Sequence, residues 1–302
     1  MKTKALRPED RGRKVFARLI VPLASEVYGP PSLPWPDDPE ALVHDTRVAS
    51  RRLVEGLELV SPALPASTVR KLRRDAKRLR RALGARREAD VMRADFERLL
   101  ARTQLPPSTG AELLDALVES GQRGLDAARE RFHPRRLGKM YARVRDAESE
   151  FSKKESLRSV AGPHLYRRAT EPEHRLEGLA DPDAVSAHHA LRIDMKRLRY
   201  TLETLTAVYP EAFEGRDPLP TCKKVQDAFG VLQDADDLRR FLEREDLARR
   251  LDETALDVLR DLALEEMEDR RRKAEEIGEA LVPDLLALAR RAAGRIGALE
   301  RA

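Results

Sequence analysis

The chain has 302 residues, of which 41% are hydrophobic, 37% are charged and only 4% are aromatic. This composition is typical of long helices with solvated faces and disfavours a β-rich fold. The net charge of +5 is compatible with an anionic partner, and the single cysteine, Cys222, excludes an internal disulfide and a cysteine metal cluster.

Apolar side chains recur with the helical period over most of the chain, and no alternating pattern typical of a β-strand is found. In the first half this pattern predicts helices at about 9–28, 39–60, 67–102 with a bend at Gly84, 109–131 and 134–151. In the second half it predicts helices from about 163, from 182 to 209, from 219 to 245 and from 252 to the C-terminus.

Two of these helices share a start signal. Asp38-Pro39 and Asp181-Pro182 each combine a good N-cap residue with a proline at the first helical position, where the missing N–H costs no hydrogen bond. The sequence therefore predicts helix starts at both dipeptides.

The N-terminal segment predicts a cytoplasmic protein. Arg18 interrupts the apolar stretch near the N-terminus, which disfavours a signal peptide. No apolar run is long enough to cross a bilayer. A lone cysteine also fits a reducing compartment.

An internal repeat is the most informative feature of the sequence. The segments 44–53 and 189–198 both fit the pattern H-x-x-R-[VI]-x-x-[RK]-R-L, and their histidines lie 145 positions apart. A second block, in which a glycine precedes acidic residues, follows each copy, and its glycines, Gly84 and Gly230, lie 146 positions apart. Two ordered motifs at nearly one offset indicate two structural copies of one helical unit.

Each copy of the first block predicts a helix with one apolar face and one basic face. The basic face carries His44, Arg47 and Arg51 in the first copy. In the second copy it carries His189, Arg192, Lys196 and Arg199. Such faces are commonly solvated or paired with glutamates one turn away. The segment 70–87, however, holds ten Lys and Arg residues and a single acidic residue, Asp75, so an anionic partner is the more economical explanation.

The duplicated motifs resemble those of the CHAD family, the conserved histidine α-helical domain. The resemblance rests on 44–53, 79–90, 189–200 and 223–236 and covers nearly the whole chain. It implies an all-α fold of two pseudo-symmetric helical bundles, of about four core helices each, with a basic cleft between them. The corresponding division is a tail at 1–8, a first bundle at 9–155 and a second at 156–302, which together form one domain.

The resemblance also implies inorganic polyphosphate as the ligand. The family's basic positions correspond here to His44, Arg47, Arg51, Arg52, Lys77, Arg78, Arg81, His189, Arg192, Lys196, Arg197, Arg199, Lys223 and Lys224. Gln226 and Asp227 stand where the first copy has Arg80 and Arg81, so unequal contributions of the two halves are expected. Rows of cations suit a polymer that carries charge on every unit, because arginine binds phosphate oxygens in pairs and lysine adds a mobile charge.

The expected function is therefore binding without catalysis, without a cofactor or a metal, in association with polyphosphate granules. Three alternatives stay open, one of which is a scaffold whose charged faces meet acidic proteins. Basic helices also bind nucleic-acid backbones, although scarce aromatic residues provide few stacking platforms. His44-Asp45 resembles the metal-binding pair of some phosphohydrolases, but no histidine precedes it and Ala190 replaces the aspartate in the second copy.

Overall fold

The computed structural model describes residues 5–29, 39–106, 108–176 and 185–298. Within these ranges the chain is helical and contains no β-strand, which confirms the predicted all-α fold class. The α-helices are α1 (Arg13–Tyr28), α2 (Pro39–Leu59), α3 (Ala66–Ala82), α4 (Gly84–Leu100), α5 (Ala111–Arg131), α6 (Pro134–Ala147), α7 (Leu157–Thr170), α8 (Glu173–Leu176), α9 (Val185–Val208), α10 (Leu219–Leu242) and α11 (Glu253–Ala298). Short 3-10 turns lie at Ser61–Ala63, Glu148–Glu150, Pro210–Phe213 and Glu245–Arg249.

Most helix ends fall within a few residues of the prediction, and the largest difference concerns α7. It begins at Leu157 rather than near Pro163, because Ser156 and Ser159 form a reciprocal capping box there. Pro163 lies inside the helix on its exposed side. The predicted caps Asp38 and Asp181 lie outside the described residues.

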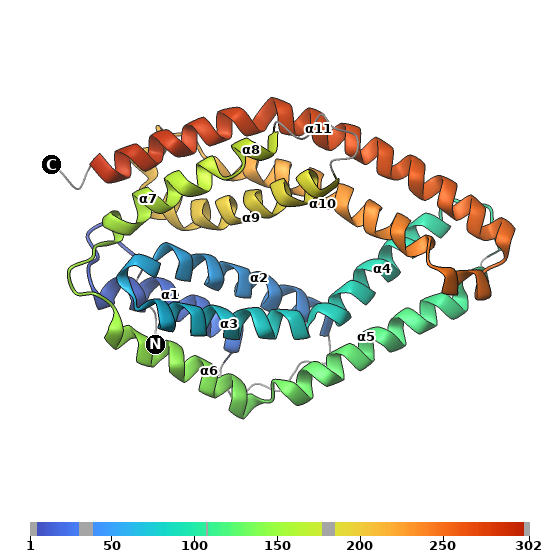
Figure 1. Cartoon of the computed structure of the whole chain (residues 1–302), viewed down its shortest axis with the longest axis horizontal. Coiled ribbons are helices and arrows are strands. Elements are labelled where there is room, and N and C mark those ends of the chain that lie inside the picture. The colour runs from blue at the N-terminus through green and yellow to red at the C-terminus, as the bar shows by residue number, and fades with distance from the viewer. Residues whose placement is uncertain (1–4, 30–38, 107, 177–184, 299–302) are drawn as a thin grey trace.

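The predicted bend at Gly84 is present. Leu83 leaves the helical conformation with a ψ of 2°, so α3 and α4 form two helices that diverge (Figure 1). In the second half, α10 runs without interruption through Gly230. The bend directs α4 away from α3 and toward the C-terminal end of α10 and the first turns of α11.

The order of helices in the two halves is consistent with a duplication. The helices α1, α2 and α3–α4 precede α5 and α6 in the first half, and α7, α9 and α10 precede the 46-residue helix α11 in the second. In Figure 1 the second-half helices form the upper layer, and α1, α2, α3 and α6 form the lower one. The division at 155/156 into two bundles stays a prediction.

Two apolar clusters stabilise this arrangement. The larger one draws on both halves and includes Phe16, Leu53 and Leu57 together with Leu198 and Phe229, all nearly inaccessible to solvent. The smaller cluster lies where α4 and α5 meet α10 and α11. Because burial of apolar surface is the main driving force of folding, the shared larger core holds the two halves together. None of the described helices combines the length and the apolar character needed to cross a bilayer.

Candidate functional site

Two adjacent cavities, which share part of their lining, lie between the basic faces of α2 and α9. The larger has a volume of about 1000 Å³ and is lined by α2, α4, α5, α9 and α10. The smaller has a volume of about 460 Å³ and is lined by α2, α3, α7 and α9. Both are bordered by a common set of side chains, here called the seam, which consists of Arg51, His189, Arg192, Lys196 and Tyr200.

The smaller cavity, here called the basic lobe, is strongly cationic. Its two acidic side chains are both neutralised, because Glu58 pairs with Arg73 and Glu55 pairs with Arg168. The other Lys and Arg side chains therefore face the lobe with no carboxylate in its lining left to balance them. The Lys and Arg residues that line it are Arg51, Arg73, Lys77, Arg80, Arg167, Arg168, Arg192, Lys196 and Arg197.

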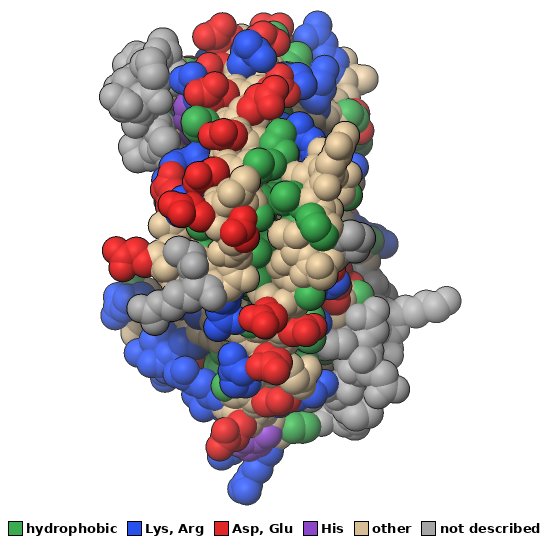
Figure 2. Space-filling model, turned by 90° about the vertical axis from the view of Figure 1, so that its right-hand side faces the viewer, with side chains coloured by type: hydrophobic (Ala, Val, Ile, Leu, Met, Phe, Trp, Pro, Cys, Tyr) green, Lys and Arg blue, Asp and Glu red, His purple; other side chains and the backbone are tan. Residues whose placement is uncertain are grey.

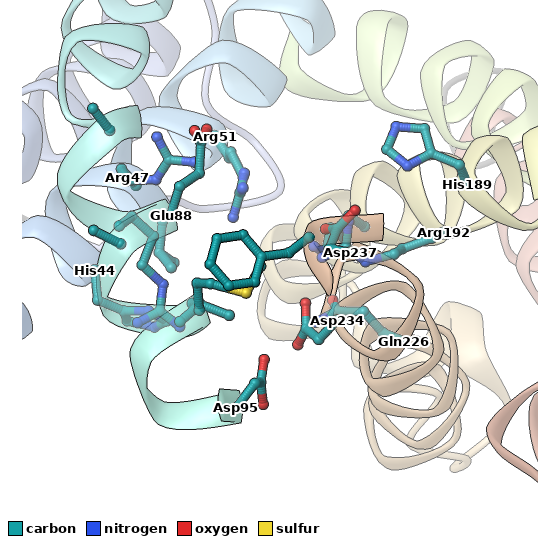
Figure 3. Close-up of a pocket in the computed structure, with 18 of the residues that line it drawn as sticks. His44, Arg47, Arg51, Glu88, Asp95, His189, Arg192, Gln226, Asp234 and Asp237 are labelled. Carbon is teal, nitrogen blue, oxygen red and sulfur yellow. The ribbon is translucent and has the colours of Figure 1, made fainter. Parts of the chain in front are cut away.

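The larger cavity, here called the mixed lobe, carries charges of both signs. Figure 3 shows His44, Arg47 and Glu88 on one side of it and His189, Arg192, Asp234 and Asp237 on the other. Its other charged lining residues are Arg51, Arg87, Asp95, Lys196, Arg199, Asp227 and Arg244.

Cations at the seam lower one another's pKa. Burial, together with the nearby Arg192 and Arg51, lowers the pKa of Lys196 to about 7. Burial and Arg51 lower the pKa of Arg47 to about 10, and burial also lowers the pKa of Arg192. Desolvation and like charges both disfavour the protonated forms. These clustered, partly desolvated cations therefore repel one another, and a bound anion would relieve that repulsion.

The family model of the CHAD domain matches residues 34–243, from the segment before α2 to the residue after α10. The chain belongs to the CHAD family. The crystal structure of the CHAD domain from the plant Ricinus communis is similar in fold, with a TM-score of 0.71 and 21% sequence identity over 93% of this chain and 94% of that one. A search of curated proteins found no match.

Nine of the predicted site residues of this CHAD domain line the two lobes. The mixed lobe contains His44, Arg47 and Arg199, the basic lobe contains Lys77 and Arg197, and the seam contains the others. The histidines of the repeat, His44 and His189, are exposed to the mixed lobe, where His189 Nδ1 lies 2.8 Å from the side-chain oxygen of Gln233. The prediction that they orient neighbouring groups or touch phosphate stays a prediction.

Five predicted residues line neither lobe. Arg52 pairs with Glu203 across the α2–α9 interface at 2.9 Å. The remaining four are exposed: Arg78, Arg81, Lys223 and Lys224. On α3 the reason is geometric, because Arg78 and Arg81 each follow a cavity-lining residue by one position and so lie about 100° around the helix.

Several cations of the basic lobe were absent from the predicted site. Arg73 and Arg80 lie three to four residues from Lys77 on α3, and this helical spacing could have identified them. Arg167 and Arg168 come from α7 and carry no repeat signal. They could not be placed from the sequence because contact between α7, α2 and α9 is tertiary.

The acidic residues of the second block separate into two groups. Asp90 pairs with Arg86 at 2.9 Å, and the buried Asp236 pairs with Arg239 and Arg240, as the sequence favours. Asp234 and Asp237 instead line the mixed lobe. Over the described residues, no group of three or more His, Cys, Asp or Glu side chains is arranged to hold a metal ion.

Proposed function

We propose that this CHAD domain binds inorganic polyphosphate in the cavity between α2 and α9, without catalysing a reaction. The observation that carries the proposal is the basic lobe, whose glutamates are already neutralised and whose cations come from four helices. Charge-assisted hydrogen bonds from arginine to phosphate oxygens are the strongest polar contacts available to such a lining. The CHAD family is also associated in general with polyphosphate and triphosphate binding.

One end of the molecule is not uniformly basic at its surface. Figure 2 shows the end of the molecule at the right of Figure 1, where acidic and basic side chains are interspersed around a column of apolar ones. On that face Lys and Arg gather at the lower left, and a smaller group lies at the upper right. A slender phosphate polymer can enter a cavity of this size, whereas a nucleic-acid duplex is restricted to outer surfaces.

One outer surface supports weak, sequence-independent binding of nucleic acid as a side activity. Arg70, Arg74, Arg78 and Arg81 form an exposed row on α3 at spacings of three to four residues. Such a row provides phosphate contacts without base contacts, so its affinity would fall steeply with salt. In a cell, the same ligand preference would place the protein at cytoplasmic polyphosphate granules.

A competition titration tests the proposed function. Labelled long-chain polyphosphate is bound at physiological salt and then challenged with duplex DNA, RNA and ATP at matched phosphate concentration. We expect unlabelled polyphosphate to displace the label and the nucleic acids to fail, because a free phosphate chain can enter the cavity and a nucleic-acid backbone cannot. Equal displacement by all four anions, with binding that collapses at modestly higher salt, would reduce the domain to a generic basic surface.

The affinity for polyphosphate is expected to depend on pH through Lys196. A bound anion favours the charged amine, so binding takes up a proton wherever the free lysine is neutral. Because the pKa of Lys196 in the free protein is about 7, the affinity should be level below that pH and fall above it. The fall should reach at most about tenfold per pH unit.

Titrations with tripolyphosphate across this range measure the effect. Lys196→Arg provides the matched variant, because arginine stays charged throughout. Its affinity should be nearly level where that of the wild type falls. The same decline in both proteins would assign the dependence to the ligand or to the other charged groups around Lys196, which are Arg51, Arg192, Arg199 and Asp234.

A further inference from the structure

The charge of the cavity changes along its length, from cationic in the basic lobe to mixed in the other lobe. In the basic lobe both glutamates are held by cations, as described above. In the mixed lobe, Asp234 and Asp237 of α10 face the cavity opposite Asp95 of α4 (Figure 3). A phosphate polymer that extends from the basic lobe past the seam would therefore meet carboxylates.

The Lys and Arg residues of the mixed lobe beyond the seam each have a polar partner, although Arg87 lies 4.0 Å from its partner Glu40. Arg199 Nε donates to Glu203 at 2.9 Å, and Arg244 donates to both carboxylate oxygens of Asp246 at 3.0 Å. The Nη1 group of Arg47 donates to a backbone carbonyl of α3 at 2.7 Å. These contacts leave the mixed lobe less able to offset its carboxylates than the basic lobe is.

Asp234 interacts electrostatically with cations of the seam. Burial raises its pKa, Arg192 and Lys196 act in the opposite direction, and Asp95 and Asp237 raise it further. The group is thus in electrostatic contact with two seam cations and with two other carboxylates. Any anion that contacts Arg192 and Lys196 comes within the field of Asp234.

We propose that Asp234 and Asp237 stop a phosphate polymer at the seam, so that the site holds the end of a chain, or a short chain, rather than the middle of a long one. The inference rests on the proposed function and names its preferred ligand. Like charges placed against a ligand are an established way to exclude one binding mode while another is kept. The basic lobe attracts the polymer, and the carboxylates set where it ends.

The test compares polyphosphate with free ends to polyphosphate of the same length that carries a bulky amide-linked label at both ends. Both are titrated against the full chain and against Asp234→Asn/Asp237→Asn. We expect blocked ends to weaken binding to the wild type by about tenfold. A polymer without a free end must pass the carboxylates of Asp234 and Asp237, which repel its phosphates. The double variant should bind both polymers equally and should bind the blocked one more tightly than the wild type does.

A matched control removes two negative charges elsewhere. Glu119→Gln/Asp257→Asn changes residues whose side chains are 71% and 64% exposed and line neither lobe, so it should preserve the wild-type preference for free ends. If the control weakened the preference for free ends as much as Asp234→Asn/Asp237→Asn does, net charge would explain the preference and the proposal would be overturned. Equal binding of both polymers by the wild type would overturn it too.

Two further outcomes separate the remaining explanations. A loss of affinity in Asp234→Asn/Asp237→Asn that requires Mg²⁺ would overturn the proposal, because the carboxylates would then hold a cation that bridges to phosphate. Failure of the wild type to bind either polymer or tripolyphosphate would instead contradict the proposed function itself. The two failures are therefore distinguishable.

Discussion

Replacing Arg51 and Arg192 together by glutamate is expected to lower the affinity for long-chain polyphosphate by about a thousandfold or more. Both residues lie at the seam and line both lobes, so an anion in either lobe can reach them. Each reversal removes a charge-assisted contact and adds a repulsion, at a cost of about 2 kcal/mol or more per site. Two such losses correspond to about three orders of magnitude in the dissociation constant.

The measurement is a fluorescence titration at physiological salt, with circular dichroism to verify helicity. Lys223→Glu/Lys224→Glu is the matched control, because it makes the same change in net charge at two exposed positions outside both lobes. The control should lose affinity only slightly. A folded Arg51→Glu/Arg192→Glu protein that binds as tightly as this control would contradict the assignment of the site to the cavity.

Glu55→Ala is expected to destabilise the fold by about 3–5 kcal/mol. The Glu55 carboxylate accepts hydrogen bonds from His164 Nε2 at 2.7 Å, from Arg168 Nε at 2.6 Å and from Thr201 Oγ1 at 3.1 Å. All four side chains are buried. Its removal leaves the buried guanidinium of Arg168 with only Glu171 as a counter-charge and breaks the link between α2, α7 and α9.

The protonation of His164 follows from its two partners. Its Nδ1 atom accepts a hydrogen bond from Arg167 Nη2 at 3.0 Å, so the ring proton resides on Nε2 and points to Glu55. Burial lowers the pKa of His164 despite the neighbouring carboxylate, and the ring is therefore neutral near pH 7. The network thus contains one negative and one positive group at its centre, and the loss of either leaves a buried charge uncompensated.

Urea unfolding followed by circular dichroism measures this cost. Glu58→Ala is the control, because Glu58 lies nearly one turn further along α2, is only partly buried and pairs with Arg73. Its loss should cost about 1 kcal/mol or less. Equal destabilisation by the two variants would show that the buried network adds nothing beyond an ordinary partly exposed ion pair.

The sequence by itself determined the helical class, the family and much of the seam. Helical periodicity identifies most helices because each buries one apolar stripe, and this rule is local. The repeat then placed Arg51, Arg192 and Lys196 on corresponding basic faces, where the structure finds them lining the cavity. The capping box of α7 has Ser159 where the usual pattern has glutamate or glutamine, so the sequence pattern does not predict the start of this helix.

Only the tertiary structure decided which basic residues face the cavity and how its charge is divided. Periodicity fixes the angle between Lys77 and Arg78 on α3 but not which of them points toward α9, because that depends on helices far away in the sequence. The same holds for Glu55, whose buried partners come from α7 and α9, and for Asp234, which lies in a lobe shared by both halves. Burial and electrostatic fields arise from all surrounding helices, so they exist only once the chain has folded.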